Sequence, residues 1–493
     1  MIGVDLGTVF SVVARVTSRG RPKVVPNRDG GRKTRSAVLF DGGVPVVGRT
    51  AGGSTGTASG VARFVGSALG DPTWRFRAPD GTAFRSEEIS AIIIRRLKED
   101  AERALRDEVT DAVLTVPACF DDASRRATAD AARIAGLTVR RVLNAPTAAA
   151  LAYGPAIAAG STVLVYALGG GAFDATVLRF GEDEIDVLAT RGDRMLGGLD
   201  WDNALMRLLN RRFQAAGGPD LLGDSASEAH LRDRAELAKH CLTTGSQARV
   251  LLGAADVART MTVRRAEFEA VTVGLLDRTR DIAQLALECA GLSCAHIDRV
   301  LPAGGATRMP MVHAMLKRLF SRPTPGPINP DEVVALGAVV EAHRGADSDR
   351  RRPTVREVTS YGLGALARDP TTGMRRNIVV IPANTTLPAT GRSVFATVAE
   401  NQTRIDVELT QGDDADPAAV RRLDCTTVRL PPHPAGSPIE IVYACDADQV
   451  PHLAVNDLTT GQRLDHFTVR NPAAMSDAQV SESVDKVNAL PPG

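Results

Sequence analysis

The sequence predicts an α/β region built from two similar halves, followed by a separate all-β domain. Strand-like and helix-like segments alternate over residues 1–345, which is typical of an α/β architecture. A glycine-rich hairpin pattern opens that region and returns in its middle. Short strand patterns separated by turns then fill residues 358–470, with the spacing of a β-sandwich.

Composition and charge limit the class of protein. The chain has 493 residues, 44% of them hydrophobic, which allows more than one domain with a proper core. A net charge of +1 gives no reason to expect nucleic acid or an anionic membrane as partner. The N-terminus shows no signal-peptide pattern, and no apolar run reaches the roughly 18 residues of a membrane span. We therefore expect a soluble, cytoplasmic protein.

The six cysteines show neither a CxxC pair nor the spacing of zinc ligands. We expect buried, reduced thiols, with disulfides or zinc as the alternatives.

Several elements of the α/β region can be placed from local signals. Residues 111–116 (DAVLTV) form a strand pattern that Pro117 ends, and residues 139–143 form another. Between them, a helix is expected from Asp121, a good N-cap, to Gly136, a good C-terminal stop. Asn144 then stands where the N-cap of the next helix belongs.

The two hairpin patterns form a weak internal repeat. MIGVDLGTVFSVVARV and VLVYALGGGAFDATVL share an apolar strand, one key residue, Leu-Gly, small residues and a second strand, and LPAGGATRMP adds a further glycine pair. A tight hairpin alone explains each turn. Their recurrence favours a two-lobed nucleotide clamp, in which bare backbone N–H groups hold phosphate.

Composition changes after the α/β region. Residues 346–357 are charged and poor in apolar side chains, so they are expected to form a linker. The tail, residues 471–493, has Ser476 as a possible helix cap and Val480, Val484 and Val487 on one helical face.

The motifs together resemble those of the 70-kilodalton heat-shock protein family of stress-response chaperones. The resemblance rests on VDLGTVFS, on residues 111–154 (DAVLTVPACFDD…NAPTAAALAYG), on ALGGGAFD, PAGGATRMP and INPDEVVALGAVVEA, and on IPANTTLPAT and ENQTRIDVELTQGD in the β domain. It covers nearly all of residues 2–470. It implies an actin-like (duplicated, ribonuclease H-like) nucleotide-binding domain and a peptide-binding β-sandwich, with the tail as the remnant of a helical lid.

Phosphate binding can be argued from the residues themselves. Gly7, Thr8 and Gly169–Gly171 supply unobstructed N–H groups, and Asp5 and Asp174 could orient waters around Mg²⁺. Ordinary turn acids are the alternative for the two aspartates.

For the nucleoside, one helical face carries polar side chains opposite Leu231, Ala235, Ala238 and Leu242. A solvated stripe would explain this face without a ligand. The resemblance implies that ATP or ADP contacts Asp5, Gly7, Thr8, Gly169, Gly170, Gly171, Asp174, Gly197, Gly198, Glu236, Lys239, His240, Thr243, Gly304, Gly305, Arg308 and Asp331. Related chains usually have Arg in place of His240 and Ser in place of Ala306.

The positions that the family uses for hydrolysis are altered. The resemblance puts the family's acids at Ala145 and Ala167, its threonine at Ala172 and, in a less secure alignment, its catalytic lysine at Ala62. Arg63 is the nearest cation. Alanine can neither neutralise charge nor orient water, so we expect hydrolysis close to nil. Compositional drift explains one such alanine more easily than several.

The interdomain and peptide-binding features also depart from the family. Phe395, Val398 and Ile405 match its peptide pocket and arch, although these side chains could be ordinary sandwich core, and Arg368 replaces an apolar arch residue. Only Val355 is apolar in RRRPTVRE, so docking of the linker is expected to be weak. Because little of the lid is present, peptide release is expected to be fast.

Four hypotheses follow. The first is a chaperone that binds ATP or ADP with Mg²⁺ and holds unfolded or apolar peptide segments, with little or no hydrolysis; J-domain proteins and nucleotide exchange factors are possible partners. The second is a pseudo-ATPase scaffold with one dedicated protein partner. A competent ATPase with displaced groups is the third, and the β-sandwich disfavours the fourth, a sugar kinase.

Overall fold

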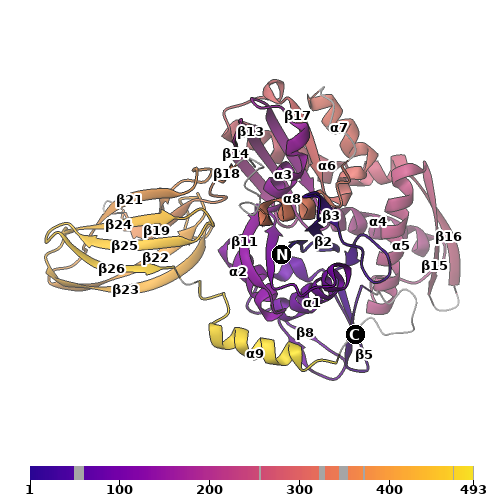
Figure 1. Cartoon of the computed structure of the whole chain (residues 1–493), viewed down its shortest axis with the longest axis horizontal. Helices are drawn as coiled ribbons and strands as arrows, with labels where there is room; N and C mark the ends of the chain where they lie inside the picture. The colour runs from indigo at the N-terminus through magenta and orange to yellow at the C-terminus, as the bar shows by residue number, and fades with distance from the viewer. Residues whose placement is uncertain are drawn as a thin grey trace.

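The α/β region lies beside the β domain, and a C-terminal helix lies against the α/β region (Figure 1). The computed structural model describes residues 1–48, 60–254, 257–320, 328–343, 354–369, 372–469 and 471–491. Among the helices in these ranges, none combines the length and apolar character needed to cross a bilayer.

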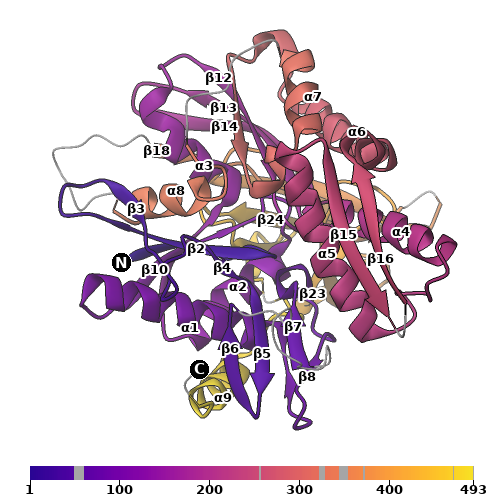
Figure 2. The same cartoon turned by 90° about the vertical axis from the view of Figure 1, so that its right-hand side faces the viewer.

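The first half of the α/β region is organised around a six-stranded sheet (Figure 2). Its main path runs β11 (Thr138–Asn144), β10 (Asp111–Val116), β1 (Ile2–Asp5), β2 (Phe10–Val16) and β3 (Pro22–Val24), and β4 (Thr34–Arg35) also pairs with β2. A small sheet orders β6 (Val44–Val47), β5 (Ala37–Asp41) and β7 (Val61–Arg63), next to the hairpin of β8 (Phe76–Arg77) and β9 (Ala83–Phe84). Helices α1 (Ser86–Leu105) and α2 (Asp122–Ile134) share its core with Ile2, Val4 and Leu114.

The second half repeats the central arrangement. Its sheet orders β17 (Arg299–Ala303), β12 (Thr162–Leu168), β13 (Phe173–Phe180), β14 (Glu184–Asp193) and β18 (Thr354–Arg356). In both halves the first strand of the glycine hairpin lies between its antiparallel hairpin partner and a parallel strand, β10 beside β1 and β17 beside β12. The internal repeat in the sequence therefore corresponds to a repeated arrangement of strands.

A further hairpin and six helices pack around the second sheet and between the two halves, in two hydrophobic clusters. They are the hairpin β15 (Gln247–Ala254) and β16 (Val257–Arg264), with α3 (Ala145–Tyr153), α4 (Gly198–Ala215), α5 (Ser225–Thr244), α6 (Arg265–Cys289), α7 (Pro310–Phe320) and α8 (Val333–Ala342). Helix α8 crosses α3 closely, because a Cβ added at Gly337 would lie 1.6 Å from the carbonyl oxygen of Ala148.

The local signals predicted these elements well. Asp121 caps α2 by accepting a backbone N–H of the first turn at 2.9 Å, and Gly136 follows that helix at φ 77°. Asn144 precedes α3, but its side chain does not cap it. Instead it accepts from Arg125 at 2.7 Å and donates to Glu357 at 3.1 Å.

The β domain consists of two four-stranded antiparallel sheets with one core. The first orders β20 (Arg375–Ile381), β19 (Leu363–Arg368), β22 (Gln402–Gln411) and β23 (Arg421–His433), and the second orders β21 (Ala389–Ala396), β24 (Pro438–Cys445), β25 (Pro451–Asp457) and β26 (Gln462–Thr468). Leu409 and Leu423 of the first sheet and Tyr443 and Leu453 of the second are fully buried in that core.

The expectation of a weakly docked linker is wrong for the part of it that the structure describes. Strand β18 pairs in parallel with β14, and Val355 is buried in the core of the α/β region. Arg356 adds ion pairs to Asp186 at 2.6 Å and to Glu184 at 3.2 Å. Backbone pairing and ion pairs hold this segment, and the number of apolar residues in the sequence indicates neither. Residues 344–353 lie outside the described ranges.

The tail helix packs on the α/β region and not on the β domain. Ser476 caps helix α9 (Asp477–Asn488), as expected, and the helix buries Val480 and Val487 in the core beneath α1 and α2. Lys486 binds Glu88 of α1 at 2.7 Å. Its valine face thus covers the first half of the α/β region.

The cysteines agree only in part with expectation. All six are free, so no disulfide forms, but only Cys119 and Cys445 are buried, whereas Cys241, Cys289 and Cys425 are exposed. The three exposed thiols lie at solvent-facing positions of α5, α6 and β23. The spacing of cysteines in the sequence does not report such exposure.

Candidate functional site

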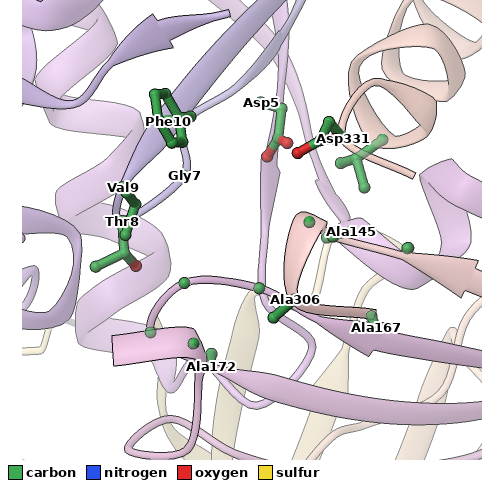
Figure 3. Close-up of a pocket in the computed structure, with 18 of the residues that line it drawn as sticks. Asp5, Gly7, Thr8, Val9, Phe10, Ala145, Ala167, Ala172, Ala306 and Asp331 are labelled. Carbon is green, nitrogen blue, oxygen red and sulfur yellow. The ribbon is translucent and has the colours of Figure 1, made fainter. Parts of the chain in front are cut away.

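A cavity of about 430 Å³ opens between the two halves of the α/β region, where the glycine hairpins meet (Figure 3). Most of the residues expected around a nucleotide line it: Asp5, Gly7, Thr8, Gly169, Gly170, Gly171, Asp174, Gly198, Glu236, Lys239, His240, Thr243, Gly304, Gly305, Arg308 and Asp331. They come from positions up to 326 residues apart, namely Asp5 and Asp331, so the fold alone assembles them.

The two hairpins contact each other through their glycines. A Cβ added at Gly170 would lie 2.5 Å from a methyl group of Val9, and one at Gly171 would lie 2.7 Å from the Thr8 hydroxyl. Side chains at either position would therefore push the halves apart. The bare backbone leaves N–H groups free to face a bound anion.

Gly197 is the one expected glycine that does not line the cavity. A Cβ there would lie 2.5 Å from the carbonyl oxygen of Gly170 and from the N–H nitrogen of Gly171. The adjacent Gly198 donates its N–H to Gly169 at 2.9 Å. Gly197 thus supports the second hairpin from behind, where the start of α4 packs against it.

Two carboxylates lie at the hairpin end of the cavity, Asp174 buried and Asp5 partly buried. Asp5 accepts from the Thr115 hydroxyl at 3.1 Å, and Asp174 accepts from the backbone N–H groups of Ala118 at 3.0 Å and Cys119 at 2.9 Å. Burial raises the pKa of Asp5 and that of Asp174 to about 6, although these hydrogen bonds oppose the rise. Both are ionised at neutral pH and can attract a cation.

Three of the four altered positions contribute only methyl groups to the cavity wall. Ala145, Ala167 and Ala172 line it (Figure 3), so these positions offer no proton carrier and no charge. Ala62 is buried in the core of the first half, in β7, and does not line the cavity. Arg63 points to Asp233 of α5, with an ion pair of 2.9 Å, and therefore does not replace a phosphate-binding lysine.

The polar face of α5 forms the second wall. Glu236 accepts from Arg35 of the first half through both carboxylate oxygens, at 2.9 and 3.0 Å. Burial alone would raise the pKa of Glu236, but hydrogen bonds and charge from Arg35 outweigh it and lower the pKa. Lys239 is tied to Asp202 at 2.7 Å and to the carbonyl oxygen of Gly198 at 2.9 Å.

Asp202 and His240 add a carboxylate and an imidazole ring to this wall. The Oδ1 atom of Asp202 is buried beside the cavity and has no hydrogen-bond partner among the described residues. A ligand hydroxyl could satisfy it. Burial and the nearby Lys239 lower the pKa of His240, so its ring is neutral at pH 7.

A glycine turn and an ion pair close the remaining side. Gly304, at φ 85°, approaches the second hairpin so closely that a Cβ would lie 2.3 Å from the carbonyl oxygen of Leu168. Arg308 pairs with Asp331 at 2.9 Å, and Ala306 lies in the same turn (Figure 3). The guanidinium therefore stands at the rim, where it can stack on a base.

The side chains that line the cavity and that the sequence reasoning missed include Val9, Phe10, Lys33 and Asp202. Val9 and Phe10 directly follow Thr8, so the hairpin motif could have indicated them. Lys33 lies in the run RKTR (residues 32–35), whose position over the cavity only the fold reveals.

The cavity fits a nucleotide with a metal ion. Glycine turns that a Cβ would fill suit phosphate, the carboxylates of Asp5 and Asp174 suit Mg²⁺, and the unpartnered oxygen of Asp202 suits ribose. Within the described ranges, no three metal-ligating side chains converge. Asp5 and Asp174 could hold Mg²⁺ only with water completing its shell.

The expected peptide-binding residues lie at one end of the β domain. Phe395 of β21 and Ile405 of β22 come from different sheets, and both pack partly against the sandwich core. Val398, between those strands, is 73% exposed. Arg368 ends β19 and bonds the carbonyl oxygen of Gly373 in the next turn at 3.3 Å.

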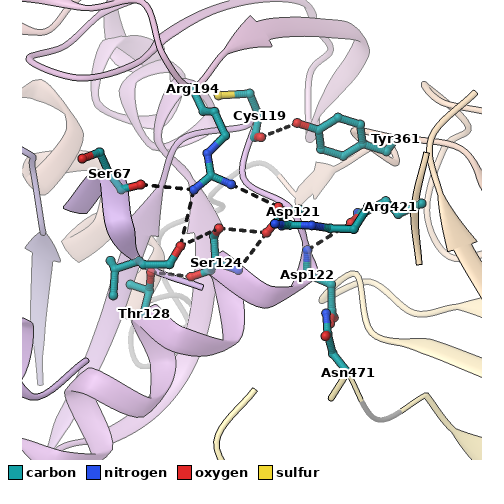
Figure 4. A network of polar contacts seen from close by, with 12 residues as sticks. Ser67, Cys119, Asp121, Asp122, Ser124, Thr128, Arg194, Tyr361, Arg421 and Asn471 are labelled. Carbon is teal, nitrogen blue, oxygen red and sulfur yellow. Dashed lines mark hydrogen bonds and ion pairs between the residues drawn. The ribbon is translucent and has the colours of Figure 1, made fainter. Parts of the chain in front are cut away.

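The start of α2, in the first half, contacts both the second half and the β domain (Figure 4). Asp121 accepts from Arg194 of the second half at 3.1 Å and also pairs with Arg421 of β23. The Tyr361 hydroxyl donates to the carbonyl oxygen of Cys119, whose N–H holds Asp174. A short chain of bonds thus joins the β domain to the floor of the cavity.

Comparisons with known proteins agree with this architecture. A family profile described as "Hsp70 protein" matches residues 1–490. Two proteins named "Chaperone protein DnaK", from two strains of Thermus thermophilus, are 38% and 37% identical over 519 aligned residues. Each alignment covers 98% of this chain and 83% of the relative. The chain belongs to the Hsp70 family of chaperones.

Proposed function

We propose that this chain binds ATP or ADP with Mg²⁺ and holds unfolded or apolar polypeptide segments, with weak or absent ATP hydrolysis. One observation carries the proposal. The glycine hairpins of both halves meet at a cavity of nucleotide size, while Ala145, Ala167 and Ala172 give its wall methyl groups in place of functional side chains.

Binding can be assigned to the residues that face the cavity. Gly7, Thr8, Gly170 and Gly171 would bind the phosphates through backbone N–H groups, whereas Gly169 donates its N–H to the carbonyl oxygen of Ala172 at 3.0 Å. Asp5 and Asp174 would hold the waters of Mg²⁺. Bound Mg²⁺ would offset the charge of the phosphates. Glu236, Lys239 and Asp202 are placed to bind ribose hydroxyls, and Arg308 to stack on adenine.

The cavity lacks charged and water-orienting side chains at the altered positions that hydrolysis would use. Transfer of a phosphoryl group depends on positioned charge and on an oriented water. Each missing group of this kind raises the barrier by about 3 kcal/mol, although such losses are not additive. With methyl groups at the altered wall positions, we expect ATP to be bound but turned over very slowly.

The finer architecture follows the same proposal. We infer that residues 1–345 form an actin-like, duplicated ribonuclease H-like domain, that 346–357 are the linker and that 358–470 bind peptide near Phe395, Val398 and Ile405. Residues 471–493 correspond to the start of the family's helical lid. J-domain proteins and nucleotide exchange factors in the cytoplasm are the expected partners.

Two measurements test the proposal. Single-turnover assays with excess protein should release phosphate far more slowly than a catalytically intact family member under the same conditions. Fluorescent apolar peptides should bind the chain with low sequence selectivity. Release at the rate of the intact protein would refute the catalytic part, and failure to bind any unfolded peptide would refute the chaperone part.

A second candidate is a pseudo-ATPase scaffold with one dedicated partner. The ionic junction at Asp121, which joins both halves and the β domain, favours it because it holds the domains in one arrangement. A single tight protein ligand in place of many weak peptides would support this candidate.

A further inference from the structure

We propose that Lys33 is the phosphate-binding cation of the cavity, with the di- or triphosphate of a nucleotide as its ligand. The inference rests on the proposed function and adds a residue that neither the motifs nor the expected site includes. From the turn before β4, it supplies the positive charge that Ala62 and Arg63 do not bring to the cavity.

Three cationic side chains stand among the described lining residues: Lys33, Lys239 and Arg308. Lys239 is buried and held by Asp202 at 2.7 Å and by the carbonyl oxygen of Gly198 at 2.9 Å. Its position on α5 directs it to the sugar side. Arg308 is held at the rim by Asp331 at 2.9 Å. Neither lies on the strand that carries the first phosphate hairpin.

Lys33 occupies a different place. Its ammonium stands 4.3 Å from the centroid of the Phe10 ring, and Phe10 begins β2, two residues after Thr8 of the hairpin. The strand that follows Lys33, β4, pairs with the start of β2 through Phe10 and Arg35. Backbone pairing therefore fixes the segment beside the first hairpin, at the part of the cavity wall that Asp331 also lines.

The contacts of Lys33 leave it able to turn toward a ligand. Its ion pair to Asp331 is long, at 3.3 Å, and its side chain is 38% exposed. By contrast, Arg35 next to it is held through both its terminal nitrogens by Glu236, at 2.9 and 3.0 Å. A flexible lysine that is held by one long ion pair and by the face of the Phe10 ring can exchange Asp331 for a phosphate oxygen at little cost.

The local charge favours this exchange. Asp5 and Asp174 are negative at neutral pH, and a nucleotide brings further negative charge to the same end of the cavity. Glycine N–H groups and Thr8 carry no net charge. Lys33 is the cation on the hairpin side that can offset the phosphates, in addition to Mg²⁺.

The test compares Lys33→Gln with Arg32→Gln in the full chain. Arg32 is the neighbouring residue, does not line the cavity and pairs with Glu332 at 2.5 Å, so its substitution removes the same charge together with a shorter ion pair. Calorimetry measures the affinities for ATP and ADP with Mg²⁺, and ligand-observed NMR measures that for adenosine. Thermal unfolding checks that both variants fold.

We expect Lys33→Gln to weaken ATP and ADP about tenfold, because it removes a hydrogen bond between charged groups, and to change adenosine by less than about twofold. Arg32→Gln should change all three by less than about twofold. Unchanged ATP affinity in Lys33→Gln would overturn the inference. So would an equal loss for adenosine, since Lys33 would then act only through Asp331. If the unaltered chain binds none of the three ligands, the proposed function fails first.

Discussion

Asp5 carries a carboxylate that the folded protein holds at an energetic cost. It lies at the wall of the cavity, and one hydrogen bond from the Thr115 hydroxyl does not compensate for its burial, which raises its pKa from 3.8 to about 6. Because the folded state favours the protonated form, ionised Asp5 destabilises the fold at neutral pH. The substitution Asp5→Asn should therefore stabilise the protein.

The size of the effect follows from the two pKa values. A difference of about 2 in pKa corresponds to about 3 kcal/mol of unfolding free energy, in full above about pH 6. Below the unfolded value of 3.8 both states are protonated and the effect vanishes. At about pH 5 roughly half of it should remain. Water in the cavity reaches part of the carboxylate, so about 3 kcal/mol is an upper limit.

Urea unfolding followed by tryptophan fluorescence measures this gain. Both tryptophans, Trp74 and Trp201, lie in the α/β region, so the signal reports on the domain that contains Asp5. Without nucleotide or Mg²⁺, Asp5→Asn should be more stable than the unaltered chain, with a larger gain at about pH 8 than at about pH 5. The same substitution should weaken binding of ATP with Mg²⁺.

Asp174→Asn is the matched control. Both oxygens of Asp174 accept backbone N–H groups, so an amide nitrogen in one of those positions would oppose a donor. This variant should gain less stability than Asp5→Asn or lose some. Equal gains for both variants, or an Asp5→Asn gain that does not depend on pH, would refute the reasoning.

Three further predictions concern the tail, the domain junction and catalysis. Val487→Ala should destabilise the docking of α9 by about 2 kcal/mol and expose the tail to limited proteolysis, because Val487 is fully buried; an unchanged cleavage rate would contradict the packing. Arg421→Ala should increase the radius of gyration in small-angle scattering more than Arg422→Ala does, because only Arg421 bonds the acid that caps α2. Ala145→Glu with Ala167→Asp should raise the single-turnover rate at least tenfold if the framework is intact; no increase would show that the cavity cannot close productively.

Local patterns predicted much of the fold because the relevant forces are local. The Asp121 cap, the stop at Gly136 and the Ser476 cap are set by neighbouring residues, and the structure agrees with each. The docking of Val355 could not be predicted in this way. It depends on backbone pairing with β14, over 160 residues away in the chain.

The candidate site was also predicted only where local sequence signals mark its residues. The glycine hairpins and the polar face of α5 were visible in the sequence because hairpin chemistry and helical spacing mark them. Lys33 and Asp202 were not, since nothing near either residue in the chain signals a cavity. For Asn144 the local signal was misleading. The residue type favours an N-cap, but in the fold its side chain bonds Arg125 and Glu357.

Binding of ATP with Mg²⁺, followed by isothermal titration calorimetry, tests the central claim most directly. We predict saturable binding at one site per chain, together with retention of intact ATP after hours of incubation. No heat of binding at millimolar nucleotide, in a chain that is folded by circular dichroism, would contradict the account.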